Sequence, residues 1–130
     1  MSLNLYSDTE GTLFSSTSVT TKHNGFTGEA DVFSFYLKND NAQHSYASVI
    51  ATVAIHPQLA LDGWAATIYH GSENLSEEEW DEVGNSTNAM SLSDTNYHEY
   101  QVRVHCPASQ QSEVYTDKIS INVSAIESMS

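Results

Sequence analysis

Positively charged residues are scarce in this chain. Four lysines and arginines stand against 17 aspartates and glutamates, which gives a formal net charge of −13 at pH 7. A nucleic-acid-binding surface needs several clustered cations to contact phosphates, and an anionic membrane surface also attracts cations. The four cations are instead spread along the chain, at Lys22, Lys38, Arg103 and Lys118. We therefore expect neither a nucleic-acid partner nor a membrane partner.

Cysteine, proline and long apolar runs are also rare. The single cysteine, Cys106, excludes an internal disulfide bond and a cysteine-rich zinc site. No apolar run approaches the roughly 18 residues of a membrane-spanning helix. The first residues lack the basic and apolar regions of a secretory signal, so we expect no such signal. The length of 130 residues predicts a single domain, residues 1–130.

The chain does contain a clear hydrophobic periodicity of two, which is typical of β-strands. In Ile119–Ala125, apolar residues alternate with serine and asparagine. Similar runs, ended by turn residues or proline, occur at 32–38, 47–55, 64–69 and 97–106, and shorter strands are expected at 2–6, 12–14, 19–22 and 89–92. No long amphipathic helix separates them. The pattern therefore predicts an all-β, antiparallel β-sandwich of about seven to nine strands.

The same alternation predicts which side chains form the core, because every second residue of a strand faces the same side of its sheet. Residues 27–130 are expected to form the β-sandwich. Residues 1–26 lie outside this pattern and would be either an N-terminal arm or edge strands. We expect one core made of Phe33, Phe35, Leu37, Val49, Val53, Ile55, Trp64, Ile68, Tyr100, Val102, Val104, Ile119, Ile121 and Val123.

One segment carries the start signal of a helix. Ser76 is a candidate N-cap, and Glu79, three residues later, completes a capping box. Leu75 and Trp80 occupy the two positions of a hydrophobic staple. We predict one short helix near residues 76–83.

The order of landmarks between Asp31 and Ser124 resembles a known kind of module. A strand ends in Leu37-Lys38-Asn39-Asp40, Asp62-Gly63-Trp64 opens a later strand, and Tyr100-Gln101-Val102-Arg103-Val104 is closed by Pro107 before the last strand. This order resembles the bacterial immunoglobulin-like domains that are appended to secreted enzymes and adhesive proteins, and the similar modules on tailed-phage virions. The resemblance covers roughly three quarters of the chain, which lacks the paired cysteines of antibody domains.

The resemblance implies an immunoglobulin-like β-sandwich and a binding or structural role, not catalysis. The virion modules imply a non-catalytic structural protein that decorates or cements a viral capsid or tail and is located on the virion. Its partner would be a capsid or tail protein, and copies of the chain could also contact one another as a homo-oligomer. The alternative is a carbohydrate- or cell-surface-binding immunoglobulin-like module.

The N-terminal stretch is the candidate anchoring segment. It lies outside the sandwich pattern and yet carries large apolar side chains, which an unpartnered arm would rarely contain. An extended segment of this kind can add a strand to the edge of a neighbouring sheet. The candidate partner-binding residues are Leu3, Leu5, Tyr6, Leu13 and Phe14.

No motif indicates a catalytic, cofactor or metal site. The six histidines lack the spacing of metal ligands. The acidic run 77–82 fits a solvated helix start better than a calcium loop, and Asn39-Asp40-Asn41 fits a turn. Cys106 and His105 do not form a catalytic pair, because neighbours on a strand face opposite sides. We expect no enzyme, no cofactor and no bound metal.

Aromatic side chains are the remaining candidates for ligand contact, because their rings can stack on sugars. Trp64 and Tyr100 have the phase of core residues. Tyr46, Tyr69 and Tyr97 are freer, and they are the candidates that the carbohydrate-binding alternative would use.

Overall fold

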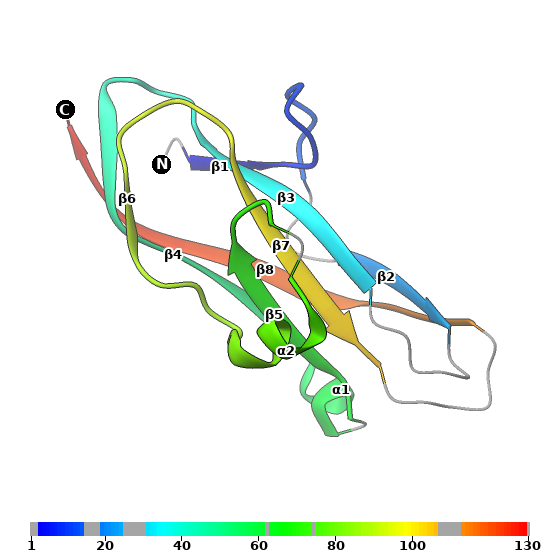
Figure 1. Ribbon diagram of the computed structural model, residues 1–130. Helices are drawn as coiled ribbons and strands as arrows, with labels where there is room; N and C mark the ends of the chain where they lie inside the picture. Colours follow the sequence, from blue (N-terminus) through cyan, green and yellow to red (C-terminus); the bar gives the residue numbers. More distant parts are fainter. Residues whose placement is uncertain are drawn as a thin grey trace.

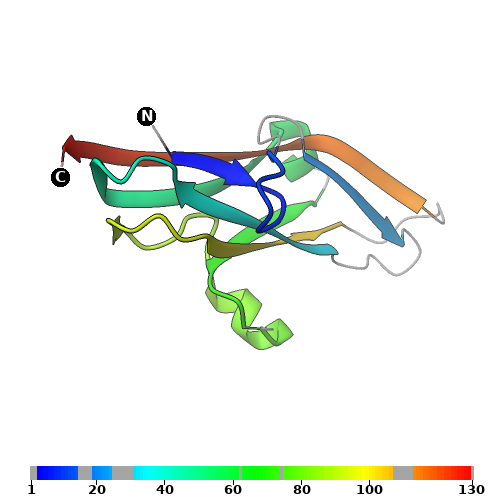
Figure 2. The ribbon, with the colours of Figure 1, turned by 90° about the horizontal axis from the view of Figure 1, so that it is seen from above.

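The computed structural model describes residues 3–14, 19–24, 31–61, 63–73, 75–106 and 113–129. Within these ranges the chain forms two four-stranded sheets and two short helices, and all paired strands are antiparallel. Figure 1 shows the strands, and Figure 2 shows the sheets from above as two layers. The predicted all-β, antiparallel sandwich is therefore confirmed.

Sheet A has the strand order β1-β3-β7-β5, and sheet B has the order β2-β8-β4-β6. Odd-numbered strands thus lie in sheet A and even-numbered strands in sheet B, so each connection along the chain crosses between the layers. The strands of sheet A are β1 (Leu3–Tyr6), β3 (Asp31–Asn39), β5 (Ala65–His70) and β7 (His98–His105). Those of sheet B are β2 (Val19–Asn24), β4 (His44–Ile55), β6 (Met90–Leu92) and β8 (Glu113–Met129).

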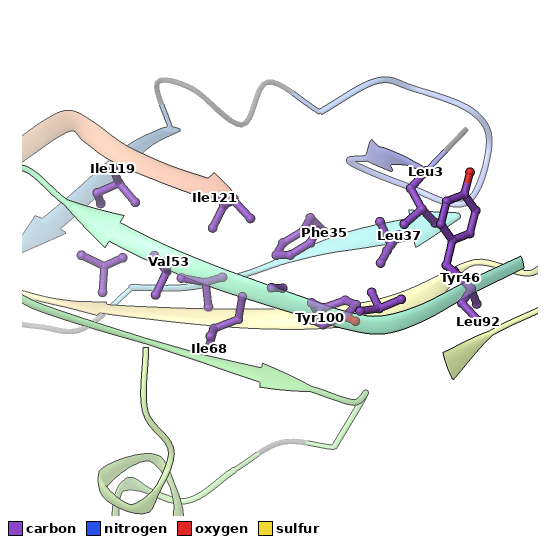
Figure 3. Packing of buried hydrophobic residues seen from close by; sticks show 14 of the residues in the cluster. Leu3, Phe35, Leu37, Tyr46, Val53, Ile68, Leu92, Tyr100, Ile119 and Ile121 are labelled. Atoms are coloured by element: carbon purple, nitrogen blue, oxygen red, sulfur yellow. The ribbon is translucent and has the colours of Figure 1, made fainter. Parts of the chain in front are cut away.

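The core fills the space between the sheets with alternate residues of the central strands (Figure 3). Tyr100 and Phe35 are fully buried, and their rings stack with centroids 5.2 Å apart. All the predicted core residues are buried except Phe33, Ile55 and Val123, which are partly buried and packed against the core. The period of two in the sequence therefore identified the inward face of each long strand.

The described parts of the segment 1–26 include two edge strands. β1 pairs with β3, so that Leu3 faces Asn39 and Leu5 faces Leu37, and β2 pairs with β8. Leu3 is only 8% exposed and belongs to the core. The sequence pattern missed this residue because β1 has only four residues, too few for a clear alternation.

A one-residue bulge in β4 brings Tyr46 into the core in addition to the predicted core residue Val49. The register between β4 and β8 shifts between Ala47 and Ile50, where Ser48 has a left-handed backbone with φ of 53°. Tyr46 and Val49 are three residues apart and are both buried as a result. The Tyr46 hydroxyl remains satisfied, because it donates a 2.7 Å hydrogen bond to Glu127 Oε1.

The predicted helix forms as α2 (Glu77–Glu82), on the outer side of sheet A (Figure 2). Ser76 is its N-cap and accepts a hydrogen bond from the Glu79 backbone N–H. Trp80 is buried, and its ring meets the ring of Tyr69 edge to face. The capping signal in the sequence therefore located this helix correctly.

A second short helix, α1 (Pro57–Leu61), was not predicted. The sequence pattern used Pro57 only as the end of a strand. Proline is also well suited to the first position of a helix, where its missing N–H needs no partner. His56 caps this start, because its Nδ1 atom accepts a hydrogen bond from the Gln58 N–H. No helix in the described ranges is long and apolar enough to cross a membrane.

Ile121 and Ile126, which lie on opposite faces of β8, provide a test of the sandwich. Ile121 is 5% exposed in the core, whereas Ile126 is 62% exposed on the outer face. Ile121→Ala should lower the free energy of unfolding by about 2–5 kcal/mol, because it leaves a cavity. The matched change Ile126→Ala should cost less than about 0.5 kcal/mol. Urea unfolding followed by circular dichroism measures both. Equal costs for the two variants would contradict the assigned faces.

Candidate functional site

The outward face of sheet A brings three tyrosines together. Because Leu5, Phe35 and Leu37 point inward, the alternating residues Tyr6 and Tyr36 point outward. The register places these two tyrosines opposite each other on β1 and β3. Tyr97, just before β7, joins them. Tyr6, Tyr36 and Tyr97 are called the tyrosine cluster below.

The rings of the cluster pack at right angles. The Tyr97 ring lies edge to face with Tyr6, with centroids 5.5 Å apart, and with Tyr36, with centroids 6.4 Å apart. Edge-to-face pairs of this kind are favourable because the positive edge of one ring meets the negative face of another. The Lys38 ammonium lies 5.7 Å from the centre of the Tyr97 ring, within cation–π range.

Asp40 connects this cluster to the end of β3. Its carboxylate accepts hydrogen bonds from Lys38 Nζ, Asn4 Nδ2 and the Tyr6 hydroxyl. Burial alone would raise the pKa of Asp40, but the hydrogen bonds from Lys38, Tyr6 and Asn4 outweigh it and lower the pKa to about 2. The hydrogen bond that the Tyr6 hydroxyl donates to Asp40, together with burial, raises the pKa of Tyr6 to about 12. Asp40 is thus charged and Tyr6 is neutral near pH 7.

A hollow of about 340 Å³ lies beside the cluster and is called the tyrosine hollow. It is lined by Thr9, Tyr36, His70, Gly71, Ser72, Tyr97, His98 and Glu99. Tyr36 and Glu99 are cross-strand neighbours on β3 and β7. Glu99 Oε2 accepts a 3.0 Å hydrogen bond from Ser34 Oγ, while Oε1 accepts none from the part of the chain that the structure describes.

The loop along one side of the hollow is held by Gln101. This buried amide, which faces outward from β7, donates hydrogen bonds to the carbonyl oxygens of Gly71 (2.9 Å) and Glu73 (2.7 Å). The Gly71 N–H in turn donates to the Glu99 carbonyl. A Cβ atom at Gly71 would lie 2.6 Å from the Tyr69 ring, so any other residue here would force that ring to move.

Two ionisable groups near the hollow have shifted pKa values. Burial lowers the pKa of His70, and the nearby His98 lowers it further, so His70 is neutral near pH 7. Asp94 is paired with His98 at 2.8 Å, and this hydrogen bond lowers the pKa of the Asp94 carboxyl. The hollow therefore combines hydroxyl groups and the neutral imidazole of His70 with the Glu99 carboxylate.

The outward face of sheet B has a different character. In the central strand pair of this face, four cross-strand pairs of β4 and β8 have side chains that carry no charge. Most are small and polar or small and apolar, and the largest exposed one is Ile126. This surface is called the uncharged face; it consists of Ala47, Ile50, Thr52 and Ala54 on β4 and Ser120, Asn122, Ser124 and Ile126 on β8.

The five predicted partner-binding residues do not share one surface. Leu3 is in the core, and Leu5 and Phe14 pack against it from the edge. Leu13 is 72% exposed, and Tyr6 belongs to the tyrosine cluster. The reason is that β1 pairs within this chain, so alternate residues of the segment face opposite sides.

Of the tyrosines expected to be free for sugars, Tyr97 alone lines the tyrosine hollow. Tyr46 is buried, and Tyr69 packs against Trp80. The sequence did carry a signal for Tyr36, because it has the opposite phase to the apolar Phe35 and Leu37. It carried none for Tyr6 and Glu99, whose places depend on which strands pair.

The sequence analysis also considered metal ligands, the turn at residues 39–41 and the thiol of Cys106. In the ranges described, no three histidine, cysteine or acidic side chains come together as a metal site would require. Residues 39–41 form a turn, in which Asn39 Oδ1 accepts a hydrogen bond from the Asn41 N–H. Cys106 is buried in the core, and burial raises the pKa of its thiol.

Comparison with known proteins identifies no relative: no protein-family model, no curated protein and no solved structure matches the chain.

The two outward faces differ in chemistry. Sheet A presents tyrosines beside charged groups, and the central pair of sheet B presents uncharged side chains.

Acid titration tests the network around Asp40. Its pKa is about 2 in the folded chain and 3.8 in the unfolded one, so its stabilising effect is complete above about pH 4 and is lost as the pH falls towards 2. The stability difference between the unmodified chain and Asp40→Asn should therefore shrink between these pH values, as measured by urea midpoints. Tyr6→Phe removes one donor and should move the loss to higher pH. A stability difference that stays constant across this range would contradict the assignment.

Proposed function

We propose that this chain is a non-catalytic, immunoglobulin-like structural module that decorates or cements a viral capsid or tail by protein–protein contact. The observation that carries the proposal is the uncharged face of β4 and β8 on a chain with a net charge of −13. This face is the surface that docks on the assembly.

The strand order supports the immunoglobulin-like part of the proposal. Immunoglobulin sandwiches have the order A-B-E-D in one sheet and pair strands C and F in the other. Here β1-β3-β7-β5 follows the first order, and β4 and β8 pair as C and F do. Two strands depart from that pattern: β2 lies beside β8 where the last strand would be, and β6 is added beside β4.

Electrostatics favours the uncharged face as the contact. The centres of protein–protein interfaces are depleted of charged residues, because a buried charge without a partner is costly. The small alanine, serine and threonine side chains would let another surface approach closely, and Ile126 offers apolar area to bury. An acidic chain is repelled by acidic surfaces, so the fitting partner has an uncharged contact centre and a neutral or basic rim.

The resemblance to modules on tailed-phage virions supports a capsid or tail as the assembly. A structural module of this kind acts by binding alone, so its surface need only match the partner in shape and chemistry. The excess of acidic residues would keep unbound copies apart in solution.

The test uses particles purified on a density gradient from the virus-containing fraction of the source of this sequence. The chain, detected by an antibody, should band with the particles. The recombinant chain should rebind to particles that lack it. It should also stay bound at about 1 M salt, where the Debye length is about 3 Å, because salt at this concentration screens charge attraction and leaves an uncharged contact intact. Absence of the chain from the particle band would overturn the proposal.

One matched pair of variants tests the contact itself. Ile126→Glu places a carboxylate in the uncharged face and should abolish rebinding. Leu13→Glu adds the same charge at another well-exposed apolar position and should rebind normally. If Ile126→Glu rebinds as well as the unmodified chain, the docking surface lies elsewhere and the proposal for this face is wrong.

A further inference from the structure

The tyrosine hollow lies on sheet A, away from the uncharged face of sheet B, and the proposed function does not use it. We infer that this hollow binds one pyranose ring of an uncharged sugar. The inference stands on the aromatic rings, the hydrogen-bonding groups and the charge of the hollow, and it does not depend on the proposed function.

The rings supply the apolar part of such a site. Tyr36 and Tyr97 both line the hollow, with their planes at 89° to each other. A pyranose has an apolar surface of C–H bonds, which packs on the electron-rich face of an aromatic ring. Two perpendicular rings form a corner in which one ring contacts that surface and the other limits its position.

The polar groups supply the other part. Each sugar hydroxyl both donates and accepts hydrogen bonds, so a sugar site needs groups of both kinds. The hydroxyls of Thr9 and Ser72 can do both, and the carboxylate of Glu99 accepts. Glu99 is held in place by Ser34 at Oε2, which leaves Oε1 to accept from a sugar hydroxyl.

The charges around the hollow favour a neutral ligand. Glu99 lines the hollow and repels anions, as does the net charge of −13. A cationic ligand is disfavoured for a different reason: the Lys38 ammonium already occupies the cation–π position over the Tyr97 ring. An uncharged polyol meets neither penalty.

The size and rigidity of the hollow also fit a single ring. A volume of about 340 Å³ lies near the lower end of the range of about 300–1,000 Å³ for small-ligand sites. The two hydrogen bonds from Gln101 hold the loop that contains Gly71 and Ser72 in place before a ligand binds. A preformed wall reduces the entropy lost on binding.

Saturation-transfer NMR on the whole chain tests this inference. The probes are the methyl pyranosides of glucose, mannose, galactose and N-acetylglucosamine, with glucuronate as the anionic probe and choline as the cationic one. At least one neutral pyranoside should bind, and its binding should shift the ring resonances of Tyr36 and Tyr97 but not those of Tyr69. The inference is overturned if no neutral pyranoside binds at about 10 mM, if choline or glucuronate binds instead, or if the Tyr36 and Tyr97 signals do not move.

Variants then test the residues in the hollow. Glu99→Gln and Tyr36→Ala should each weaken binding by about tenfold, the effect of losing one good polar or stacking contact. Tyr36→Phe should keep binding within about twofold, because the ring remains. Glu79→Gln makes the same charge change on α2, and Ile126→Glu alters the uncharged face; neither should change binding. Unchanged affinity in both Glu99→Gln and Tyr36→Ala would contradict the assigned site. Because Ile126→Glu separates docking from sugar binding, each can fail without the other.

Discussion

The registered pairing of antiparallel strands is the constraint on which this structure depends. In the pair β3–β7, Phe35 lies opposite Tyr100 in the core, while their neighbours Tyr36 and Glu99 lie opposite each other on the outside. The pair β4–β8 has the same alternation: its buried apolar residues alternate along each strand with the residues of the uncharged face. A slip of one residue would exchange inside and outside along a whole strand. The core and both outward faces are therefore consequences of the same register.

The features that could be predicted from the sequence are those whose signal lies within a short stretch of the chain. Alternation within one strand is local, and it correctly placed the core residues of the long strands, including Ile121. The capping box at Ser76 is also local, and it correctly located α2. The tyrosine hollow could not be predicted, because its lining combines residues of β3, β5 and β7, which are far apart along the chain and meet only through strand pairing. Leu3 was missed because the four residues of β1 are too few for a clear alternation.

The distribution of charge gives the two sheets different roles in this account. Charged groups gather near the tyrosine cluster, where Asp40 and Lys38 are part of the packing. The four cross-strand pairs of the uncharged face carry none, which is the arrangement expected of a surface that is covered in an assembly. An attached chain would then hold the opposite sheet, with its hollow, towards the solvent. Docking and sugar binding would thus be compatible in one small domain.

Hydroxyl-radical footprinting by mass spectrometry, on the free chain and on the chain bound to its particle, tests this two-faced arrangement most directly. The method reports the solvent exposure of individual side chains, and isoleucine and tyrosine both react. When the chain binds its particle, oxidation of Ile126 should decrease strongly, while oxidation of Tyr36 and Tyr97 should stay unchanged. Protection of the two tyrosines together with an unchanged Ile126 would contradict this arrangement, because the chain would then attach through sheet A.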